Sequence, residues 1–169
     1  MQRRTLLALA IAASSLAVAP HSLAQSAKAL AGTYSGVSFS MTDGAGKKTQ
    51  IFGENPRAMM VLTPDGRYSI IVMRASLPKF ASNARPKGTP EENKAVVDGS
   101  IAHFGRYTID DKDSTITFHV ESSTFPNWDR EAQKRPFTLK GDELSYKVPT
   151  ASTGTGSAEV IWKRMKPAL

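Results

Sequence analysis

Residues 57–75 read RAMMVLTPDGRYSIIVMRA, and this stretch has the pattern of a β-hairpin. Two runs that mix apolar and polar residues flank the turn sequence Pro64-Asp65-Gly66. Proline presets one backbone dihedral angle of a turn, and glycine accepts the positive φ that closes it. The stretch therefore predicts two strands, at 57–63 and 67–75, joined by a tight turn.

Similar short runs, separated by turn residues, recur through the rest of the chain after Gly32. Regular spacing of this kind is typical of an all-β sandwich or barrel. Two irregular stretches, at 76–89 and 122–133, predict longer loops. We expect about nine strands, within a range of eight to ten. Besides the hairpin, they are predicted at 32–41, 49–52, 103–110, 115–121, 135–139, 144–148 and 159–165.

One short segment has the features of a helix start. Thr89 offers a hydroxyl cap, Pro90 suits the first helical position, and Glu91 and Glu92 face the positive end of the helix dipole. The segment predicts a single helix of about ten residues that ends near Gly99.

The first 24 residues have the features of a secretory leader. Arg3 and Arg4 precede an apolar run at 6–13, and small residues lead to Ala24. The run is shorter than the roughly 20 apolar residues that cross a bilayer. We expect cleavage after Ala24, a domain at 25–169 without a transmembrane segment, and a periplasmic or secreted protein. The arginine pair fits either a twin-arginine signal or an ordinary charged start.

Composition limits the function classes for the domain. The chain holds 22 basic and 15 acidic residues, and the leader holds two basic and no acidic ones, which leaves a formal charge of +5. The basic residues are scattered, which indicates a solvated surface and does not favour nucleic acid binding. The chain has no cysteine, and two histidines, His103 and His119, lack a third metal ligand. We predict no metal and no cofactor.

Ten short segments of the chain match those of a known family in their residues, their order and their spacing. The chain resembles the bacterial and fungal lipocalin-like domain family over nearly the whole length after the leader. The resemblance implies a single antiparallel β-barrel around a central cavity, and it implies no reaction. The segments are Leu30-Ala31-Gly32-Thr33-Tyr34, Phe52-Gly53 with Pro56, Thr63-Pro64-Asp65-Gly66, Met73-Arg74, Thr89-Pro90-Glu91-Glu92, Phe104-Gly105-Arg106-Tyr107, 115–121, Pro126-Asn127-Trp128, Arg135 and Trp162-Lys163-Arg164.

The resemblance also implies how the barrel closes. Gly32 and Tyr34 on the first strand, with Trp162 and Arg164 on the last, resemble the aromatic face and covering guanidinium at the closed end of such barrels. We interpret these residues as structural. The chain departs from the family by having Tyr34 in place of tryptophan, His103 in place of tyrosine and Phe118 in place of histidine, which puts any ligand of the family in doubt here.

Alternate residues of a barrel strand point inward, so strand parity sorts the candidates for a cavity. The inward sets are mostly apolar with a few polar members, a composition that suits an apolar ligand with a polar head. Trp128, in a loop beside Pro126, could cap the mouth or only cover the core edge. The ligand-binding candidates are Met60, Arg74, His103, Tyr107, Phe118, Trp128 and Arg135.

Two candidates are cationic. Arg74 and Arg135 could hold an anionic head, because a guanidinium presents donors in a planar fork that fits a carboxylate. Alternatively, both lie near strand ends, reach solvent, and pair with Glu121 or Asp129. The sequence leaves both interpretations open.

Three function hypotheses follow. The first is an exported module that binds a small apolar or amphipathic molecule in the barrel. The second is an isomerase, cyclase or hydrolase that uses His103, Tyr107 and an arginine, although the sequence holds no Gly-x-Ser-x-Gly elbow and no paired catalytic acids. The third is an envelope protein with a filled barrel and a partner on its outer surface. The oligomeric state is not determined by the sequence.

Overall fold

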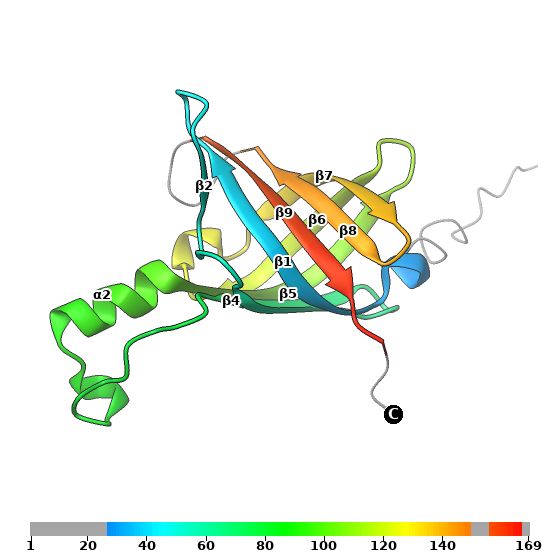
Figure 1. Cartoon of the computed structure of the whole chain (residues 1–169). Helices are drawn as coiled ribbons and strands as arrows, with labels where there is room; N and C mark the ends of the chain where they lie inside the picture. The colour runs from blue at the N-terminus through cyan, green and yellow to red at the C-terminus, as the bar shows by residue number, and fades with distance from the viewer. Residues whose placement is uncertain (1–26, 150–155, 167–169) are drawn as a thin grey trace, which may run out of the picture.

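A computed structural model describes residues 27–149 and 156–166, and these ranges form one closed β-barrel (Figure 1). The described part confirms the predicted antiparallel barrel with one short helix; the predicted leader at 1–24 lies outside the described residues. The strands are β1 (Gly32–Thr42), β2 (Lys48–Gln50), β3 (Arg57–Leu62), β4 (Arg67–Met73), β5 (Ser100–Asp110), β6 (Thr115–Ser123), β7 (Ala132–Lys140), β8 (Glu143–Val148) and β9 (Ser157–Arg164). The helices are α2 (Pro90–Gly99) and two 3₁₀ turns, η1 (Arg85–Lys87) and η2 (Pro126–Trp128).

The first and last strands close the barrel. The sheet order is β2-β1-β3-β4-β5-β6-β7-β8-β9, and β1 also pairs with β9, so that β1 and β3 to β9 form a ring. The β1–β9 ladder runs from the Tyr34–Arg164 pair to the Thr42–Ser157 pair. Strand β2 pairs only with the far end of β1 and stands at one end of the barrel (Figure 1).

The hairpin of residues 57–75 forms as predicted, with β3 paired to β4 from Arg57–Met73 to Leu62–Tyr68. Gly66 has a φ of 85°, which is the left-handed conformation that the turn requires. The carbonyl of Gly66 also accepts a hydrogen bond of 2.7 Å from the backbone N–H of Tyr107. The turn is therefore tied to β5 as well as to its own strands.

Several element boundaries differ from those expected. The strand predicted at 49–52 ends at Gln50, because the chain turns at Ile51 and Phe52 toward the barrel mouth. Strand β7 begins at Ala132, three residues before Arg135, because backbone bonds between Val120 and residues 130 and 131 extend the β6–β7 ladder. The loop predicted at 122–133 is accordingly shorter.

Helix α2 has the predicted bounds, and its capping box explains its start. The Thr89 hydroxyl accepts a hydrogen bond from the Glu92 N–H, and the Glu92 carboxylate accepts one from the Thr89 N–H. The same carboxylate accepts a bond of 2.8 Å from the Ala81 N–H, which ties the preceding loop to the helix. The helix extends away from the barrel wall (Figure 1).

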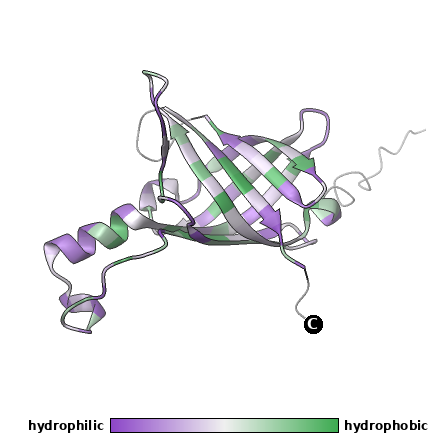
Figure 2. Ribbon diagram, in the orientation of Figure 1, coloured by the Kyte–Doolittle hydropathy of each residue, from purple (hydrophilic) through white to green (hydrophobic). Residues whose placement is uncertain are grey.

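Alternate side chains of the strands point into the barrel, and hydrophobic and hydrophilic segments follow one another along the strands that face the viewer (Figure 2). One end is closed by a helical turn at 27–30, where Leu30 is buried. The Tyr34 hydroxyl donates to the Leu30 carbonyl at 2.7 Å, and the Tyr107 hydroxyl donates to the carbonyls of Ala27 and Thr63.

Arg164 covers the same end. Its guanidinium lies 4.9 Å from the centre of the Tyr34 ring and donates to the carbonyls of Ala31 and Ala29. A Cβ on Gly32 would lie 3.0 Å from the guanidinium, so a side chain there would crowd Arg164. Three of the four residues that the resemblance assigned to closure, Gly32, Tyr34 and Arg164, lie together at this end. Trp162 lies further inside the barrel.

The irregularity in the β5–β6 ladder depends on Gly105. A Cβ at this position would lie 2.1 Å from the His119 carbonyl oxygen and 2.8 Å from the Glu121 nitrogen, and neither backbone atom can rotate away. We expect Gly105→Ala to lower the free energy of unfolding by about 1–3 kcal/mol, as overpacking against rigid atoms does. Urea denaturation measures the change. Gly44→Ala, where nothing lies within 4 Å of the added carbon, should stay within about 0.5 kcal/mol of the parent; equal effects of the two would contradict this account.

Candidate ligand-binding site

The barrel is hollow toward the end opposite the helical turn. The space between the lining side chains, counted out to the open mouth, is about 630 Å³, of which about 80 Å³ is open to the centre of a water molecule. One water requires roughly 10–15 Å³ by that second measure. The hollow can therefore hold more than a single water. It is lined by Phe39, Ile51, Phe52, Ile70, Val72, Ile101, His103, Phe118, Trp128, Gln133, Arg135, Tyr146, Val148, Ala158, Val160 and Trp162.

Four of the seven predicted ligand-binding candidates line this hollow: His103, Phe118, Trp128 and Arg135. The other three lie elsewhere. Met60 is fully buried in the core, and Tyr107 uses its hydroxyl at the closed end. Arg74 is exposed just beyond the end of β4.

Sequence reasoning did not select the aromatic residues that β1, β8 and the turn after β2 contribute. Strand parity would have found Tyr146 and Val160, because both alternate with exposed or half-buried neighbours. Strand parity does not predict that Phe39 faces inward. The β1–β9 ladder shifts register between Gly36 and Ser38, and the shift changes which residues of β1 face the interior. Phe52 lies in a turn, and its ring contacts Phe39 edge-on at 5.6 Å.

Arg135 is the only cationic side chain lining the hollow within the described ranges. Its side chain is 9% exposed, and its guanidinium donates to the Lys134 carbonyl at 3.1 Å and to the Gln133 amide oxygen at 2.9 Å. No carboxylate lies within 4 Å of it among the residues that the structure describes. The charge of Arg135 therefore has no counter-ion in this part of the protein.

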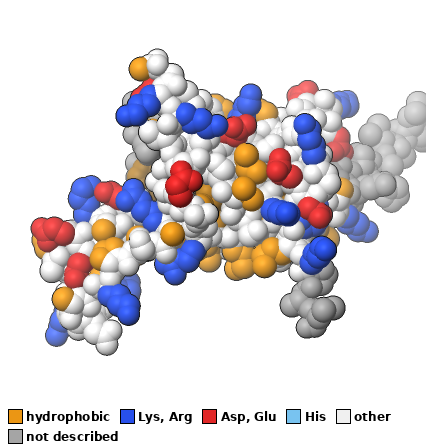
Figure 3. Space-filling view, viewed as in Figure 1, with side chains coloured by type: hydrophobic (Ala, Val, Ile, Leu, Met, Phe, Trp, Pro, Cys, Tyr) orange, Lys and Arg blue, Asp and Glu red, His pale blue; other side chains and the backbone are white. Residues whose placement is uncertain are grey.

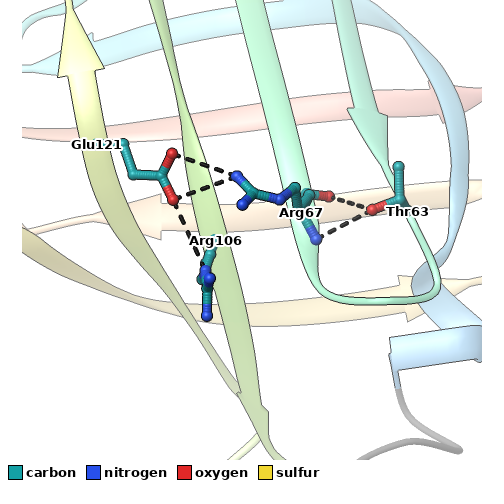
Figure 4. Close-up of polar contacts among 4 residues, drawn as sticks. All are labelled: Thr63, Arg67, Arg106 and Glu121. Atoms are coloured by element: carbon teal, nitrogen blue, oxygen red, sulfur yellow. Dashed lines mark hydrogen bonds and ion pairs between the residues drawn. The ribbon is translucent and has the colours of Figure 1, made fainter.

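The two acids that could have paired with Arg135 are engaged on the outside. Glu121 accepts from Arg67 at 3.3 Å and forms an ion pair with Arg106 at 3.7 Å (Figure 4). Asp129 accepts a hydrogen bond of 2.7 Å from the Ser123 N–H. The interpretation of Arg135 as a solvent-exposed partner of these acids is thus wrong.

Burial is the main influence on the charge of Arg135, and it lowers the pKa of the guanidinium. The hydroxyls of Tyr146 and Tyr68 act in the opposite direction. The guanidinium in turn lowers the pKa of His103, after burial, which is the larger cause. We call Arg135, His103, Tyr68 and Tyr146 the polar cluster.

His103 is held in its neutral form. Burial, followed by the charge of Arg135, lowers its pKa to about 4. Its Nδ1 lies 2.9 Å from the Tyr68 hydroxyl, and burial raises the pKa of that hydroxyl above its usual value. The Trp128 ring contacts the imidazole edge-on at 5.4 Å. At neutral pH this pair is therefore uncharged, with His103 on the cavity wall and Tyr68 in the core beside it.

Trp162 brings an unused donor to the hollow. Its side chain is fully buried, and its indole N–H has no hydrogen-bond partner within bonding distance among the described residues. It lies near enough to the Tyr146 hydroxyl to lower the pKa of that group, although burial dominates and raises the pKa to about 12. A buried donor without an acceptor costs about 1–3 kcal/mol.

Trp128 lies at the mouth. The 3₁₀ turn η2 begins at Pro126, and the Asp129 N–H donates back to the Pro126 carbonyl, which fixes the turn between β6 and β7. The Trp128 ring packs edge-on against Phe125 at 5.7 Å and is half-buried. The turn thus places an aromatic ring over the polar cluster at the rim of the hollow.

Outside the barrel, apolar side chains are exposed on neighbouring strands β3, β4 and β5, namely those of Met59, Ile71 and Phe104. Hydrophobic side chains gather along the lower edge of the barrel in Figure 3, whereas charges of both signs are dispersed over the rest of that face. His119 is also outside and lies 3.0 Å from the Thr108 hydroxyl. Within the described residues no group of three or more His, Asp or Glu side chains could hold a metal, and no helix is long and apolar enough to cross a membrane.

Comparisons with known proteins point to one family. Residues 31–165 match the model of a lipocalin-like domain. A 4'-hydroxy-3'-methoxypropiophenone carrier protein of Aspergillus oryzae is 32% identical over 106 residues, which cover 58% of this chain and 96% of that protein. The matched region contains all nine described strands in full.

Arg135 should reduce the stability of the empty protein. We expect Arg135→Met to raise the free energy of unfolding by about 1–3 kcal/mol, because the variant replaces an unpaired buried charge with an apolar side chain of similar length. Urea denaturation of protein stripped of bound small molecules measures it. Arg57→Met, at an exposed arginine of β3, is the matched control and should change little. A clear loss of stability in Arg135→Met would show that the arginine instead stabilises the fold.

Proposed function

Because the chain belongs to the lipocalin-like domain family, we propose that it is an exported carrier that holds one small, partly apolar molecule inside its barrel. One observation supports this most directly: the hollow is closed at one end, open at the other, and lined mainly by aromatic and aliphatic side chains around a small polar cluster. Binding pockets for small molecules typically combine these two features.

The size of the hollow favours a small cargo. The volume that the centre of a water-sized molecule can reach is about 80 Å³, which lies below the roughly 300–1,000 Å³ of typical ligand pockets. Phe52 and Trp128 also narrow the mouth. A molecule of one or two rings suits this space better than a long lipid chain does.

The relative from Aspergillus oryzae gives independent support. Its name describes a carrier of an aromatic ketone that bears a hydroxyl and a methoxy group. Such a molecule has a flat apolar body with polar oxygens at its edge. The ring-lined hollow and polar cluster of this chain suit the same general shape, and we extend to this chain the role of carrier and not the identity of that cargo.

An enzymatic function is less well supported, although the hydrogen-bonded pair of His103 and Tyr68 resembles groups that transfer protons in enzymes. A general base works best when its pKa lies near the working pH, and a pKa of about 4 makes His103 a poor base at neutral pH. No Ser, Thr, Asp or Glu lines the hollow among the described residues. The lining therefore lacks the usual nucleophiles and acids that would act with His103.

An envelope protein with a filled barrel is also less well supported, because the barrel retains open space. The exposed side chains of Met59, Ile71 and Phe104 could still contact a partner. Such contact would add to the carrier role and would not replace it.

A filled cavity should abolish binding. N-phenyl-1-naphthylamine, a neutral apolar dye, should become fluorescent on entering the hollow. Ala158 is buried on β9 and lines the hollow, so Ala158→Phe should weaken dye uptake about tenfold or more, at the cost of about 1–3 kcal/mol of stability. Lys147→Phe, at an exposed position of neighbouring β8, should bind like the parent. If the parent takes up no dye, or Ala158→Phe takes up as much, the carrier proposal fails.

Export is the other part of the proposal, and it depends on the leader-like residues 1–24. Expressed with these residues in a Gram-negative host, the protein should accumulate in the periplasm with an intact mass that begins at Gln25. The double variant Arg3→Lys and Arg4→Lys should block export by the twin-arginine route and leave the general secretory route active. Uncleaved protein confined to the cytoplasm would contradict the proposal.

A further inference from the structure

We propose that the cargo is a small aromatic molecule carrying a single ionised oxygen group, a carboxylate or a phenolate, and that Arg135 is the residue that binds this group. The inference rests on the carrier function and specifies its ligand class. It depends on the charge, the unused donors and the ring walls of one hollow, taken together.

The first step is the charge. Arg135 carries a positive charge into a space whose lining, within the described residues, contains no acid. Burying an unpaired charge is costly, and an anion that enters the hollow would remove that cost. Among the described residues, the only side chain that accepts a hydrogen bond from the guanidinium is the neutral amide of Gln133. The missing counter-ion is therefore best supplied by the ligand.

The second step is the supply of donors. A guanidinium has five N–H donors, and within the described ranges Arg135 uses two of them, on the Lys134 carbonyl and the Gln133 amide. The indole N–H of Trp162 is buried, lines the same hollow and makes no hydrogen bond of good geometry among the described residues, although the Tyr146 hydroxyl lies near it. An excess of donors over acceptors calls for a ligand group that only accepts hydrogen bonds, as a carboxylate or phenolate oxygen does.

The third step limits the ligand to one charge. His103 faces the same space, but burial and the neighbouring arginine keep it neutral at physiological pH. Arg135 is then the only positive charge on the wall within the described ranges. A monoanion is neutralised by it, whereas a dianion would keep one uncompensated charge in an apolar cavity.

The fourth step concerns the body of the ligand. Phe118 lies between Tyr68 and Tyr146, with ring centres 4.7 and 5.8 Å away, and Phe39 contacts Trp162 edge-on at 5.1 Å. Aromatic rings pack favourably against such walls in edge-on or offset arrangements. A flat ring therefore fits the space beside Arg135 better than a flexible chain, which would lose more conformational entropy on binding.

The carboxylate form is tested with cinnamate and cinnamamide, which have nearly the same shape and differ in charge. Trp128 and Trp162 are the only tryptophans of the chain and both line the hollow, so quenching of tryptophan fluorescence reports binding. The parent should bind cinnamate on the order of tenfold to a hundredfold more tightly than cinnamamide, as charge-assisted hydrogen bonds allow. Arg135→Met should remove this preference, Arg135→Lys should restore part of it, and Arg57→Met should leave it unchanged.

The phenolate form is tested with 4-nitrophenol, whose ionised form is yellow. The parent should lower the pKa of the bound phenol, because the guanidinium stabilises the phenolate. In Arg135→Met the pKa of the bound phenol should instead rise above its value in water, because an apolar cavity without a cation favours the neutral form. Absorbance titrations with and without protein measure both shifts, and the two arms distinguish a carboxylate preference from a phenolate preference.

The outcomes separate this inference from the carrier function. If the dye N-phenyl-1-naphthylamine enters but cinnamate binds no better than cinnamamide and 4-nitrophenol shows no lowered pKa, the ligand class is wrong and the carrier function stands. If neither the dye nor the aromatic probes enter the parent, the carrier function fails as well. A preference for cinnamate that persists in Arg135→Met would show that another group binds the anion.

Discussion

The pairing of β1 with β9 is the constraint on which the rest of the molecule depends. Eight residue pairs join the first and last strands, and this ladder turns an open sheet into a ring. Once the ring is closed, every second side chain of each strand must face a common interior. The hollow and the burial of Arg135 are consequences of that closure. With no cysteine in the chain, these strand pairings and apolar burial are what maintain the ring.

The two ends of the barrel are formed by different kinds of interaction. At one end the helical turn at 27–30 supplies backbone carbonyls that accept from Tyr34, Tyr107 and Arg164, so polar groups are satisfied and the end is sealed. At the other end Phe52 and Trp128 cover the space with rings, which pack without needing fixed hydrogen bonds. A rim of side chains on turns can separate more easily than a sealed, hydrogen-bonded end. The asymmetry gives the hollow one side for entry.

The fold and part of the candidate site could be predicted from the sequence, because the interactions that determine them act between residues close together in the chain. The turn at Pro64-Asp65-Gly66 and the capping box at Thr89 act over a few residues, so the hairpin and α2 could be predicted closely. Parity selected His103, Phe118 and Arg135, because β5, β6 and β7 alternate regularly inside the barrel. It could not select Phe39, since the bulge at Val37 changes the inward parity of β1. It also placed Arg74 and Tyr107 in the cavity, because parity does not tell how far along the barrel axis a side chain lies or that the strand has ended.

The free-energy cost of burying the charge of Arg135 is the feature that connects the structure to a function. A barrel selected only for stability would place an apolar residue at this position, since the guanidinium lacks a carboxylate partner among the described residues and its burial opposes ionisation. The two acids that the sequence offered as partners are engaged elsewhere: Glu121 is held on the outer face by Arg67 and Arg106, and Asp129 accepts a hydrogen bond from the Ser123 N–H. The arrangement leaves the interior with a charge that a ligand can neutralise and the exterior cannot. An anionic ligand that neutralises this charge would add stability to the folded state, as thermodynamic linkage requires of any ligand that binds only the folded protein.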